Sequence, residues 1–246
     1  MGTVAAVLSG KGGTGKTSVC AGVAVALSGA GARVLCVDCD VGLRNLDISL
    51  GLADSGALSF RDISEGGYSL DQAAIHPFHP NLYFLTAPMN CRVDQIDVDA
   101  FSKMLWDART KFDYILLDAP AGVEGGFRLV SAAADRFIVV TGAGPASVRD
   151  AGRVGELLEL AGKTDVRILV NRVDRTMLSI LDQTIDDVMD AAGLPLIGVV
   201  LEDPDVPMAA ACGMSLQRYN KRSSAARSFE RIAKRIQGYP VPIKIR

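Results

Sequence analysis

The chain has 246 residues, of which 49% are hydrophobic and 22% are charged, so it can bury one large core and falls within the size range of a single α/β domain. Its formal net charge of −2 at pH 7 argues against a wholly basic nucleic-acid-binding protein, and its five cysteines, an odd number, do not suit a disulfide framework. No secretory signal is recognisable and no run of about 18 apolar residues occurs, so we expect a cytoplasmic protein without a membrane span.

Short apolar runs alternate with longer amphipathic segments, which is typical of a doubly wound, mostly parallel sheet with helices on both faces. Most of the short runs are nearly continuous Val, Ile and Leu, as expected for strands buried on both faces. We predict strands at 3–9, 33–38, 82–87, 114–118, 137–141, 167–171 and 197–201. We predict helices at 16–29, 97–111, 147–161, 179–192 and 223–237, all within one domain spanning 1–246.

The segment between the first predicted strand and the first predicted helix reads S-G-K-G-G-T-G-K-T-S and fits the phosphate-binding pattern G-x-x-x-x-G-K-[ST]. In this pattern the glycines let backbone N–H groups surround a phosphate, the lysine reaches the β- and γ-phosphates, and the hydroxyl is a ligand of Mg²⁺. The start of the following helix adds partial positive charge to the same site. The sequence therefore predicts a P-loop NTPase whose phosphate site is formed by Gly10, Lys11, Gly12, Gly13, Thr14, Gly15, Lys16, Thr17 and Ser18.

Acidic residues follow two of the predicted strands at the edge where ligands of such sheets bind. Asp38 and Asp40 come at the end of the second strand, and either could face the phosphate site or simply cap a helix. Asp118 ends the apolar run 114–117 and fits a metal-holding Walker B aspartate. Gly122, four residues later, offers a backbone N–H that could sense a γ-phosphate.

The second lysine of the loop, Lys11, makes the segment resemble the deviant Walker A motif of the ParA/MinD superfamily. Within that superfamily, four further segments are similar to the MinD family of septum-site-determining ATPases: V-D-C-D-V-G-L-R-N-L-D (37–47), D-A-P-A-G-V-E (118–124), S-V-R-D (147–150) and G-V-V-L-E-D (198–203). The similarity covers about residues 1–236.

This resemblance implies an ATPase switch that uses ATP/ADP and Mg²⁺, dimerises around ATP and releases its partners after hydrolysis. Hydrolysis would be slow and stimulated by a partner. The implied roles are phosphate and Mg²⁺ binding by Lys16 and Thr17, metal support by Asp38 and Asp118, water positioning by Asp40, and contact with the partner subunit's nucleotide by Lys11. Adenine would be held by Asn171, Arg172, Glu202 and Asp203, and a regulatory protein would dock near Ser147, Asp150 and Arg153.

Two departures from the family limit what the resemblance implies. Leu201 stands where the family usually has a proline, so the adenine loop is expected to be less rigid. The segment 238–246 contains two prolines, which forbid a regular helix where MinD proteins carry an amphipathic membrane-targeting helix. We therefore expect little direct membrane binding, with peripheral attachment at the inner membrane face through a partner left open.

Other functions stay open as alternatives, and the distribution of charge bears on the one that involves DNA. From Val206 onward the chain has nine Lys or Arg residues and a single acid, Glu230, so weak binding of DNA is conceivable. The alternatives are a ParA-like DNA-partitioning ATPase, a regulator of flagellar number, and a nucleotide-gated scaffold that does not hydrolyse ATP.

Several conspicuous residues receive a structural interpretation. Cys36 and Cys39 form a C-x-x-C without a second pair, so we predict no metal site there. The histidines of the segment 76–80 (H-P-F-H-P) are predicted to lie in a surface turn. The helix at 223–237 is predicted to dock its apolar stripe on the core and to expose its basic face.

Overall fold

The computed structural model describes residues 1–53, 55–89, 91–123, 125–180, 182 and 184–243, apart from the side chain of Met177. Its described strands form one eight-stranded sheet in the order β3-β4-β2-β5-β1-β6-β7-β8, parallel throughout except for the antiparallel pair β3 and β4. The strands are β1 (Thr3–Leu8), β2 (Val34–Asp38), β3 (Ala74–His76), β4 (His79–Leu85), β5 (Tyr114–Asp118), β6 (Arg136–Thr141), β7 (Asp165–Val173) and β8 (Leu196–Leu201). The α-helices are α1 (Lys16–Gly29), α2 (Leu46–Leu50), α3 (Phe60–Ser64), α4 (Val98–Ala108), α5 (Gly125–Ala133), α6 (Pro145–Leu160), α7 (Arg175–Ile180), α8 (Ile185–Ala192), α9 (Asp205–Ala211), α10 (Leu216–Asn220) and α11 (Ser224–Ile236), with 3₁₀ turns at η1 (Leu70–Gln72) and η2 (Val93–Gln95).

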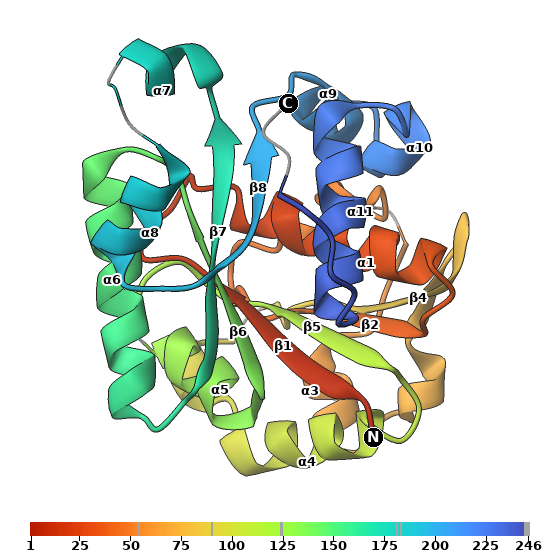
Figure 1. Ribbon diagram of the computed structural model, residues 1–246. Helices are drawn as coiled ribbons and strands as arrows, with labels where there is room; N and C mark the ends of the chain where they lie inside the picture. The colour runs from red at the N-terminus through yellow and green to blue at the C-terminus, as the bar shows by residue number, and fades with distance from the viewer. Residues whose placement is uncertain (54, 90, 124, 181, 183, 244–246) are drawn as a thin grey trace.

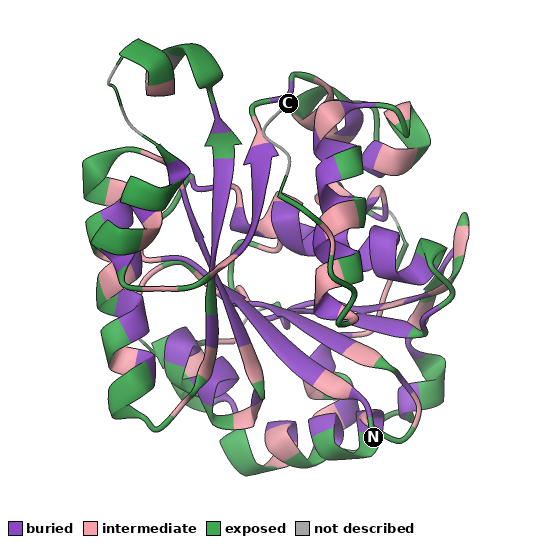
Figure 2. Cartoon of the chain, in the orientation of Figure 1, coloured by how far each residue is buried: buried purple, intermediate pink, exposed green. Residues whose placement is uncertain are grey.

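The sheet separates two hydrophobic cores (Figures 1 and 2). Helices α1 and α11 cover one face, while α3, α4, α5, α6 and α8 cover the other. Strand β2 explains the continuous apolar runs of the sequence, because all its residues are buried and alternate ones pack into opposite cores: Leu35 and Val37 into one, Val34 and Cys36 into the other. The predicted doubly wound fold is confirmed.

The terminal helix docks on the core as predicted. Phe229 of α11 is buried against α1, where a Cβ at Gly22 would lie 2.2 Å from the Phe229 ring, and Ile232 is buried against Gly198 of β8. Only a glycine lets the two helices approach this closely. Residues 238–243 are not helical, as the prolines predict, and 244–246 lie outside the described residues. Among the described residues, no helix is long and apolar enough to cross a membrane.

The surface turn predicted at 76–80 is present at Pro77 and Phe78, which are exposed, but the two histidines lie in the flanking strands and not in the turn. His76 ends β3 and His79 begins β4, so the segment is the tip of a β-hairpin. His76 is only 2% exposed, with Nε2 lying 2.8 Å from the Leu50 carbonyl oxygen, and Nε2 of His79 lies 3.0 Å from Ser215 Oγ. The two prolines are tolerated because Pro77 lies in the turn, and Pro80 lies at the irregular start of β4, before the residues that pair with β2.

The helix predicted at 179–192 begins later than expected. Helix α8 starts at Ile185 because Thr184 forms a capping box, in which the Thr184 hydroxyl accepts from the Asp187 N–H and the Asp187 carboxylate accepts from the Thr184 N–H. Residues 181 and 183 of the predicted helix lie outside the described residues.

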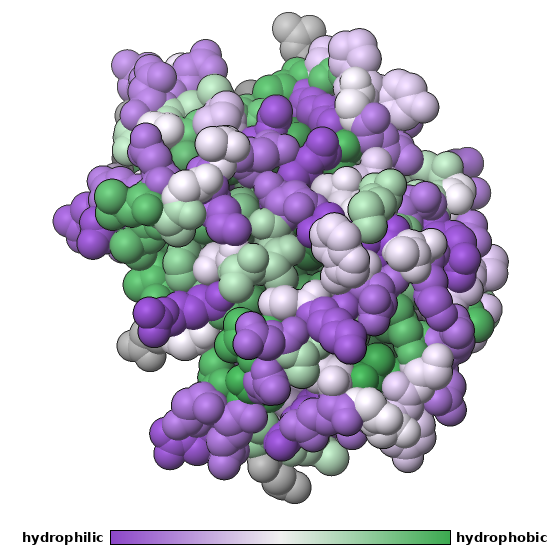
Figure 3. Space-filling view, turned by 90° about the horizontal axis from the view of Figure 1, so that it is seen from below, coloured by the Kyte–Doolittle hydropathy of each residue, from purple (hydrophilic) through white to green (hydrophobic). Residues whose placement is uncertain are grey.

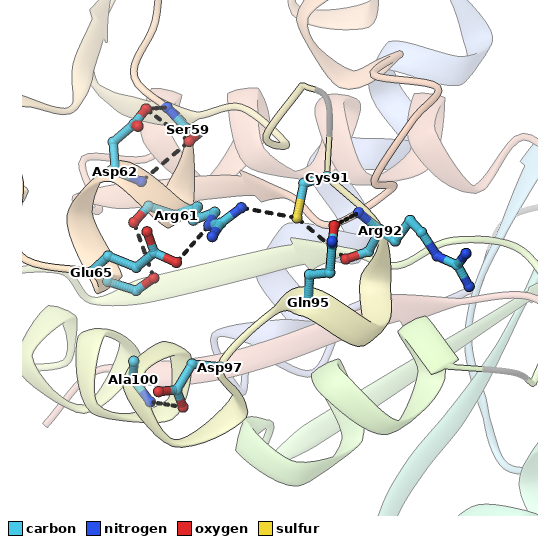
Figure 4. A network of polar contacts seen from close by, with 10 residues as sticks. Ser59, Arg61, Asp62, Glu65, Cys91, Arg92, Gln95, Asp97 and Ala100 are labelled. Carbon is cyan, nitrogen blue, oxygen red and sulfur yellow. Dashed lines mark hydrogen bonds and ion pairs between the residues drawn. The ribbon is translucent and has the colours of Figure 1, made fainter.

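Short helices that the sequence analysis did not predict connect the larger elements, and side-chain contacts hold them in place. Arg61 of α3 pairs with Glu65 and donates from Nη1 to Cys91 Sγ at 3.3 Å (Figure 4). The Cys91 thiol in turn donates to the carbonyl oxygen of Arg92. This network joins α3 to the segment that leads into α4.

Candidate nucleotide site

The phosphate loop connects the carboxyl end of β1 to the start of α1. Gly13 and Gly15 both adopt left-handed backbone angles (φ 80°), which favour glycine. Gly15 is the N-cap of α1 and offers no side chain to its first N–H groups, so these remain available to an anion. A Cβ built on Gly12 or Gly13 would meet no heavy atom within 4 Å, so the outer side of the loop is open. The loop thus has the shape and the free donors that a phosphate group requires.

Lys16 is buried and its ammonium lies 2.7 Å from Asp118 Oδ1. Burial opposes the charge of Lys16, but the Asp118 carboxylate outweighs this and raises the pKa of Lys16. Burial raises the pKa of Asp118, against the opposing effects of Lys16 and of a hydrogen bond from Thr17. The sequence-predicted lysine, hydroxyl and Walker B carboxylate are therefore in direct contact, although they are about a hundred residues apart in the chain.

Asp38 and Asp118 lie opposite each other in the register of β2 and β5. Asp38 accepts hydrogen bonds from the Asp40 N–H at 2.9 Å and from the Leu46 N–H, the first residue of α2, at 3.1 Å. Burial, with the added charge of Asp118, raises the pKa of Asp38 to about 7, although the two N–H groups oppose this. Asp38 therefore helps to begin α2 and also places a second buried carboxyl beside Asp118.

Asp40 is half-buried, unlike Asp38. Burial raises the pKa of Asp40, and the positive charge of Lys16 opposes this, so the two side chains interact electrostatically. Since Asp40 is at the open side of the same cluster, its carboxylate is accessible to water.

A single carboxylate cluster does not form a complete metal site here. No group of three or more His, Cys, Asp or Glu residues within the described part of the chain is arranged to hold a metal ion. Mg²⁺ is commonly bound by one or two protein oxygens together with substrate phosphates. The Thr17 hydroxyl, which hydrogen-bonds to Asp118, and Asp38, which lies opposite Asp118, fit that arrangement. Cys36 and Cys39 are free buried thiols.

The Gly122 amide is engaged in this structure. It has a left-handed backbone (φ 89°) and donates to the Ser9 carbonyl oxygen at 3.0 Å. A contact between this N–H and a γ-phosphate would require that hydrogen bond to open. The role of Gly122 stays a prediction.

Three of the four residues expected around adenine gather beside the loop. Asn171 Nδ2 donates to the Thr14 carbonyl oxygen at 2.8 Å, and Arg172 pairs with Glu202 through two hydrogen bonds of 2.8 and 3.2 Å. Arg172 also reaches the Gly13 carbonyl oxygen at 3.4 Å and has a left-handed backbone (φ 55°), a strained conformation for a side-chain-bearing residue.

These residues line a pocket of about 250 Å³ whose wall also includes Leu201 and Phe229. Phe229 belongs to the terminal helix, and the sequence analysis placed it only in the core. Its position beneath the pocket depends on how α11 packs, which no local motif reveals.

Asp203 has a structural role within this pocket. Its carboxylate accepts hydrogen bonds from Ser224 Oγ (2.7 Å), the Ala225 N–H (2.9 Å) and the Asp205 N–H (3.0 Å). Burial alone would raise the pKa of Asp203, but these donors outweigh it and lower that pKa. The loop after β8 is thereby fixed to the start of α11, and the Asp203 carboxylate is largely occupied.

The residues predicted to meet a partner protein lie at the start of α6. Asp150 touches the phosphate loop, because a Cβ at Gly10 would lie 2.6 Å from the Asp150 carbonyl oxygen. Ser147 Oγ accepts from the Gly142 N–H and the Thr141 hydroxyl, so it holds the preceding turn. Arg153 is exposed and pairs with Glu156 at 2.8 Å. Of these three residues, only Arg153 is exposed to solvent, and Ser147 and Asp150 are half-buried.

Comparison with known proteins adds independent evidence about this site. The family model described as CobQ/CobB/MinD/ParA nucleotide binding domain matches residues 5–217. The chain is 35% identical to the septum site-determining protein MinD of Synechocystis over 244 residues, covering 98% of this chain and 92% of the relative. It is 36% identical to that of Thermotoga maritima over 248 residues, covering 99% and 91%.

Solved structures agree with these relatives. The MinD chain in the MinC:MinD cell division protein complex of Aquifex aeolicus superposes with a TM-score of 0.90 at 31% identity, covering 98% of each chain. MinD of Pyrococcus horikoshii in complex with Mg-ADP superposes with a TM-score of 0.84 at 29% identity, covering 96% of each chain. Near full-length similarity, the shared fold and the loop geometry agree, and the chain is a member of the MinD family of nucleotide-binding proteins.

Proposed function

We propose that this protein is a Mg²⁺-dependent ATPase that acts as a nucleotide-controlled switch in placing the cell-division site. The observation that carries the proposal is the cluster of Lys16, Thr17, Asp38, Asp40 and Asp118 below an uncapped helix N-terminus. Curated relatives are named for septum-site determination, and one solved relative is in complex with Mg-ADP. We infer that residues 1–246 act as one ATPase domain, since the described strands join one sheet.

The residues of this chain would share the chemistry as follows. The ammonium of Lys16 and the open N–H groups of the loop bind and orient the phosphates. Thr17, Asp38 and Asp118 would hold Mg²⁺, which when bound neutralises charge on the phosphate oxygens. Asp40 accepts a hydrogen bond from the attacking water and orients it, and Gly122 would contact the γ-phosphate. Asn171, Arg172 and Glu202 enclose the base pocket.

We further propose that ATP brings two copies together through Lys11. The Lys11 side chain is exposed on the outer side of the loop, so a second subunit's nucleotide is accessible to it. A cation supplied across an interface stabilises the charge of the transition state, which makes a lone subunit slow and a dimer faster.

A regulatory protein is proposed to dock on the exposed side of α6. A large groove of about 940 Å³ runs between α6 and the turn after α8, with Arg149, Arg153 and Glu156 among its lining residues. One structural relative was solved as a MinC:MinD complex. Docking there would stimulate hydrolysis, because α6 touches the phosphate loop through Asp150. Such a partner would also provide peripheral attachment to the inner membrane face.

Phosphate release by Asp40→Ala tests the enzymatic proposal. The variant should bind Mg-ATP with wild-type affinity, since Lys16, Thr17 and Asp118 remain, and should hydrolyse it at least tenfold more slowly with and without a partner. Lys103→Ala on the outer face of α4 is the control and should behave as wild type. Unchanged turnover in Asp40→Ala would remove Asp40 from the mechanism, and no turnover in the wild type even with a partner would favour the nucleotide-gated scaffold.

A further inference from the structure

A second pocket lies at the opposite end of the sheet from the phosphate loop, where the strands begin. It has a volume of about 260 Å³ and is lined by first residues of four strands, namely Thr3, Tyr114, Arg136 and Asp165. The last turn of α11 closes its other side. Figure 3 views this end of the molecule, the lower side of Figure 1, and shows mostly hydrophilic surface around smaller hydrophobic patches. The proposed nucleotide site is at the carboxyl ends of the strands, so the two pockets are separate.

Three arginines and one carboxylate give this pocket an excess of positive charge. Arg136 and Arg167 project from the same face of neighbouring strands, because Arg136 pairs with Asp165 in the register and Arg167 follows two residues later. Arg235 reaches the pocket from α11. The excess is notable in a chain whose net charge is −2.

The hydrogen bonds in the pocket leave guanidinium donors free. Asp165 forms an ion pair with Nε of Arg136 (3.0 Å) and accepts a hydrogen bond from Nε of Arg167 (3.2 Å), and Arg136 Nη1 donates to the Ile236 carbonyl oxygen. Each of the three side-chain nitrogens of Arg235 donates one hydrogen bond, to the carbonyl oxygen of Ile197 or Val241. Among the described residues, Nη2 of Arg136 and both terminal nitrogens of Arg167 have no hydrogen-bond acceptor.

Folding alone does not account for this arrangement. The side chains of Arg136, Arg167 and Asp165 are 41%, 50% and 34% exposed, and ion pairs at such exposure contribute little to stability. Exposed guanidinium groups with free terminal nitrogens instead suit a planar or tetrahedral oxyanion that accepts paired hydrogen bonds. Apolar side chains of the lining, including Ile138 and Ile197, leave room for a small organic group beside the anion.

We propose that this pocket binds a phosphate monoester or diester through Arg136 and Arg167, with Arg235 adding positive charge. The volume is near the lower end for ligand sites, so the ligand is a phosphate with a small organic group rather than a whole nucleotide. Such a group occurs in free metabolites and in lipid headgroups, and the pocket would recognise the phosphate that they share.

Calorimetry with glycerol 3-phosphate tests the free ligand, using the full chain saturated with Mg-ADP so that the phosphate loop is occupied. We expect saturable binding with a dissociation constant on the order of 1 mM and at least tenfold weaker binding by Arg167→Gln. Arg92→Gln is the matched control, because Arg92 also pairs through Nε with an aspartate two residues away, Asp94, and lies outside the pocket. Wild-type Mg-ADP affinity in Arg167→Gln checks its folding, and Arg167→Lys, which keeps the charge without the planar fork, should weaken binding less than Arg167→Gln.

Sedimentation with phosphatidylglycerol vesicles tests the lipid source. Vesicle binding that Arg167→Gln weakens and Arg92→Gln does not, without binding of free glycerol 3-phosphate, would identify a lipid headgroup as the ligand. Saturable glycerol 3-phosphate binding would identify a soluble one. Equal behaviour of wild type, Arg167→Gln and Arg92→Gln with both probes would overturn the proposal. The proposal would stand even if the proposed ATPase activity failed, since ADP is used here only to occupy the phosphate loop.

Discussion

Lys16 has two roles at the residue scale, as counter-charge of buried Asp118 and as proposed phosphate ligand. Removing one partner of a buried ion pair leaves an uncompensated charge. We predict that Lys16→Ala lowers the free energy of unfolding by about 3–5 kcal/mol, and that Lys16→Ala with Asp118→Asn recovers most of this loss. Urea denaturation of the two variants and of Lys103→Ala measures it.

Nucleotide binding separates the two roles. Both Lys16 variants should lose most of their affinity for ATP in calorimetry, including the stable double variant, because the phosphates lose the cation that reaches them. Wild-type affinity in the double variant would contradict the phosphate role. Wild-type stability of Lys16→Ala would contradict the counter-charge role.

The residues of the site that could be predicted from sequence are those whose spacing along the chain fixes their relation. Lys16 and Thr17 follow a loop, and Asp38 and Asp118 end buried strands, so the parallel sheet brings them together. Asp203 and Phe229 could not be assigned in this way. Asp203 fixes α11 and Phe229 lines the proposed base pocket, and both depend on tertiary contacts between β8 and α11 that leave no local pattern.

At the scale of elements, the parallel strands could be predicted because burial on both faces gives them continuous apolar runs. The edge strand β3 could not be predicted because it has no such run. The apolar run of β2 predicts a buried strand directly, whereas β3 is only three residues long and ends in a histidine. Helices of five residues such as α2 and α3 are too short to show a 3.6-residue period. Caps and side-chain contacts fix these helices instead. Ser59, for example, is the N-cap of α3, and its hydroxyl accepts a hydrogen bond from the Asp62 N–H.

The β3–β4 hairpin should make stability depend on pH. Burial, the neighbouring His76 and Arg218 lower the pKa of His79 to about 4, from about 6.5 in an unfolded chain. The unfolded state therefore binds more protons between these values, so the free energy of unfolding falls as the pH drops from 6.5 towards 4. Because His79 is half-exposed, we expect its contribution to this loss by pH 5 to be about 1 kcal/mol.

Urea denaturation of His79→Asn at pH 7.5 and pH 5.0 tests this assignment. Asparagine can still hydrogen-bond to Ser215 but does not titrate in this range, so the variant should lose less stability than wild type between the two pH values. The same pH dependence in both proteins would place the responsible group elsewhere. Arg92→Gln, whose charge is exposed, is a suitable control.

At the scale of the whole molecule, association with a second copy should depend on ATP and on Lys11. Without a γ-phosphate, the two nucleotide faces have little to join them. In an Asp40→Ala background, where ATP persists, we predict a dimer in Mg-ATP, a monomer in Mg-ADP, and a monomer in Mg-ATP after Lys11→Ala. Light scattering coupled to size exclusion measures the mass. A dimer of equal strength in ADP, or one that survives Lys11→Ala, would defeat the proposed arrangement.

The basic segment from Val206 onward is only partly available to acidic surfaces. The apolar stripe of α11, including Phe229 and Ile232, is buried against α1 and β8 and so is unavailable for insertion into a bilayer. Several of the basic side chains are also engaged, since Arg235 binds backbone carbonyls and Arg218 stacks 3.4 Å from the centre of the Phe78 ring. Among the described residues of this segment, the exposed charges that remain are those of Lys221, Arg222, Arg227 and Lys234.

Binding of this 246-residue chain to acidic vesicles or DNA should therefore be electrostatic, weak and nearly independent of the bound nucleotide. Salt screens such charges over a Debye length of about 8 Å at physiological ionic strength, so binding should fall steeply along a salt series. Sedimentation with vesicles in ATP and in ADP measures this, and the double variant Arg227→Gln/Lys234→Gln should bind more weakly at low salt. Tight, salt-resistant binding in ATP alone would require α11 to release its apolar face from α1, and the docked helix seen here would then be only one of its two states.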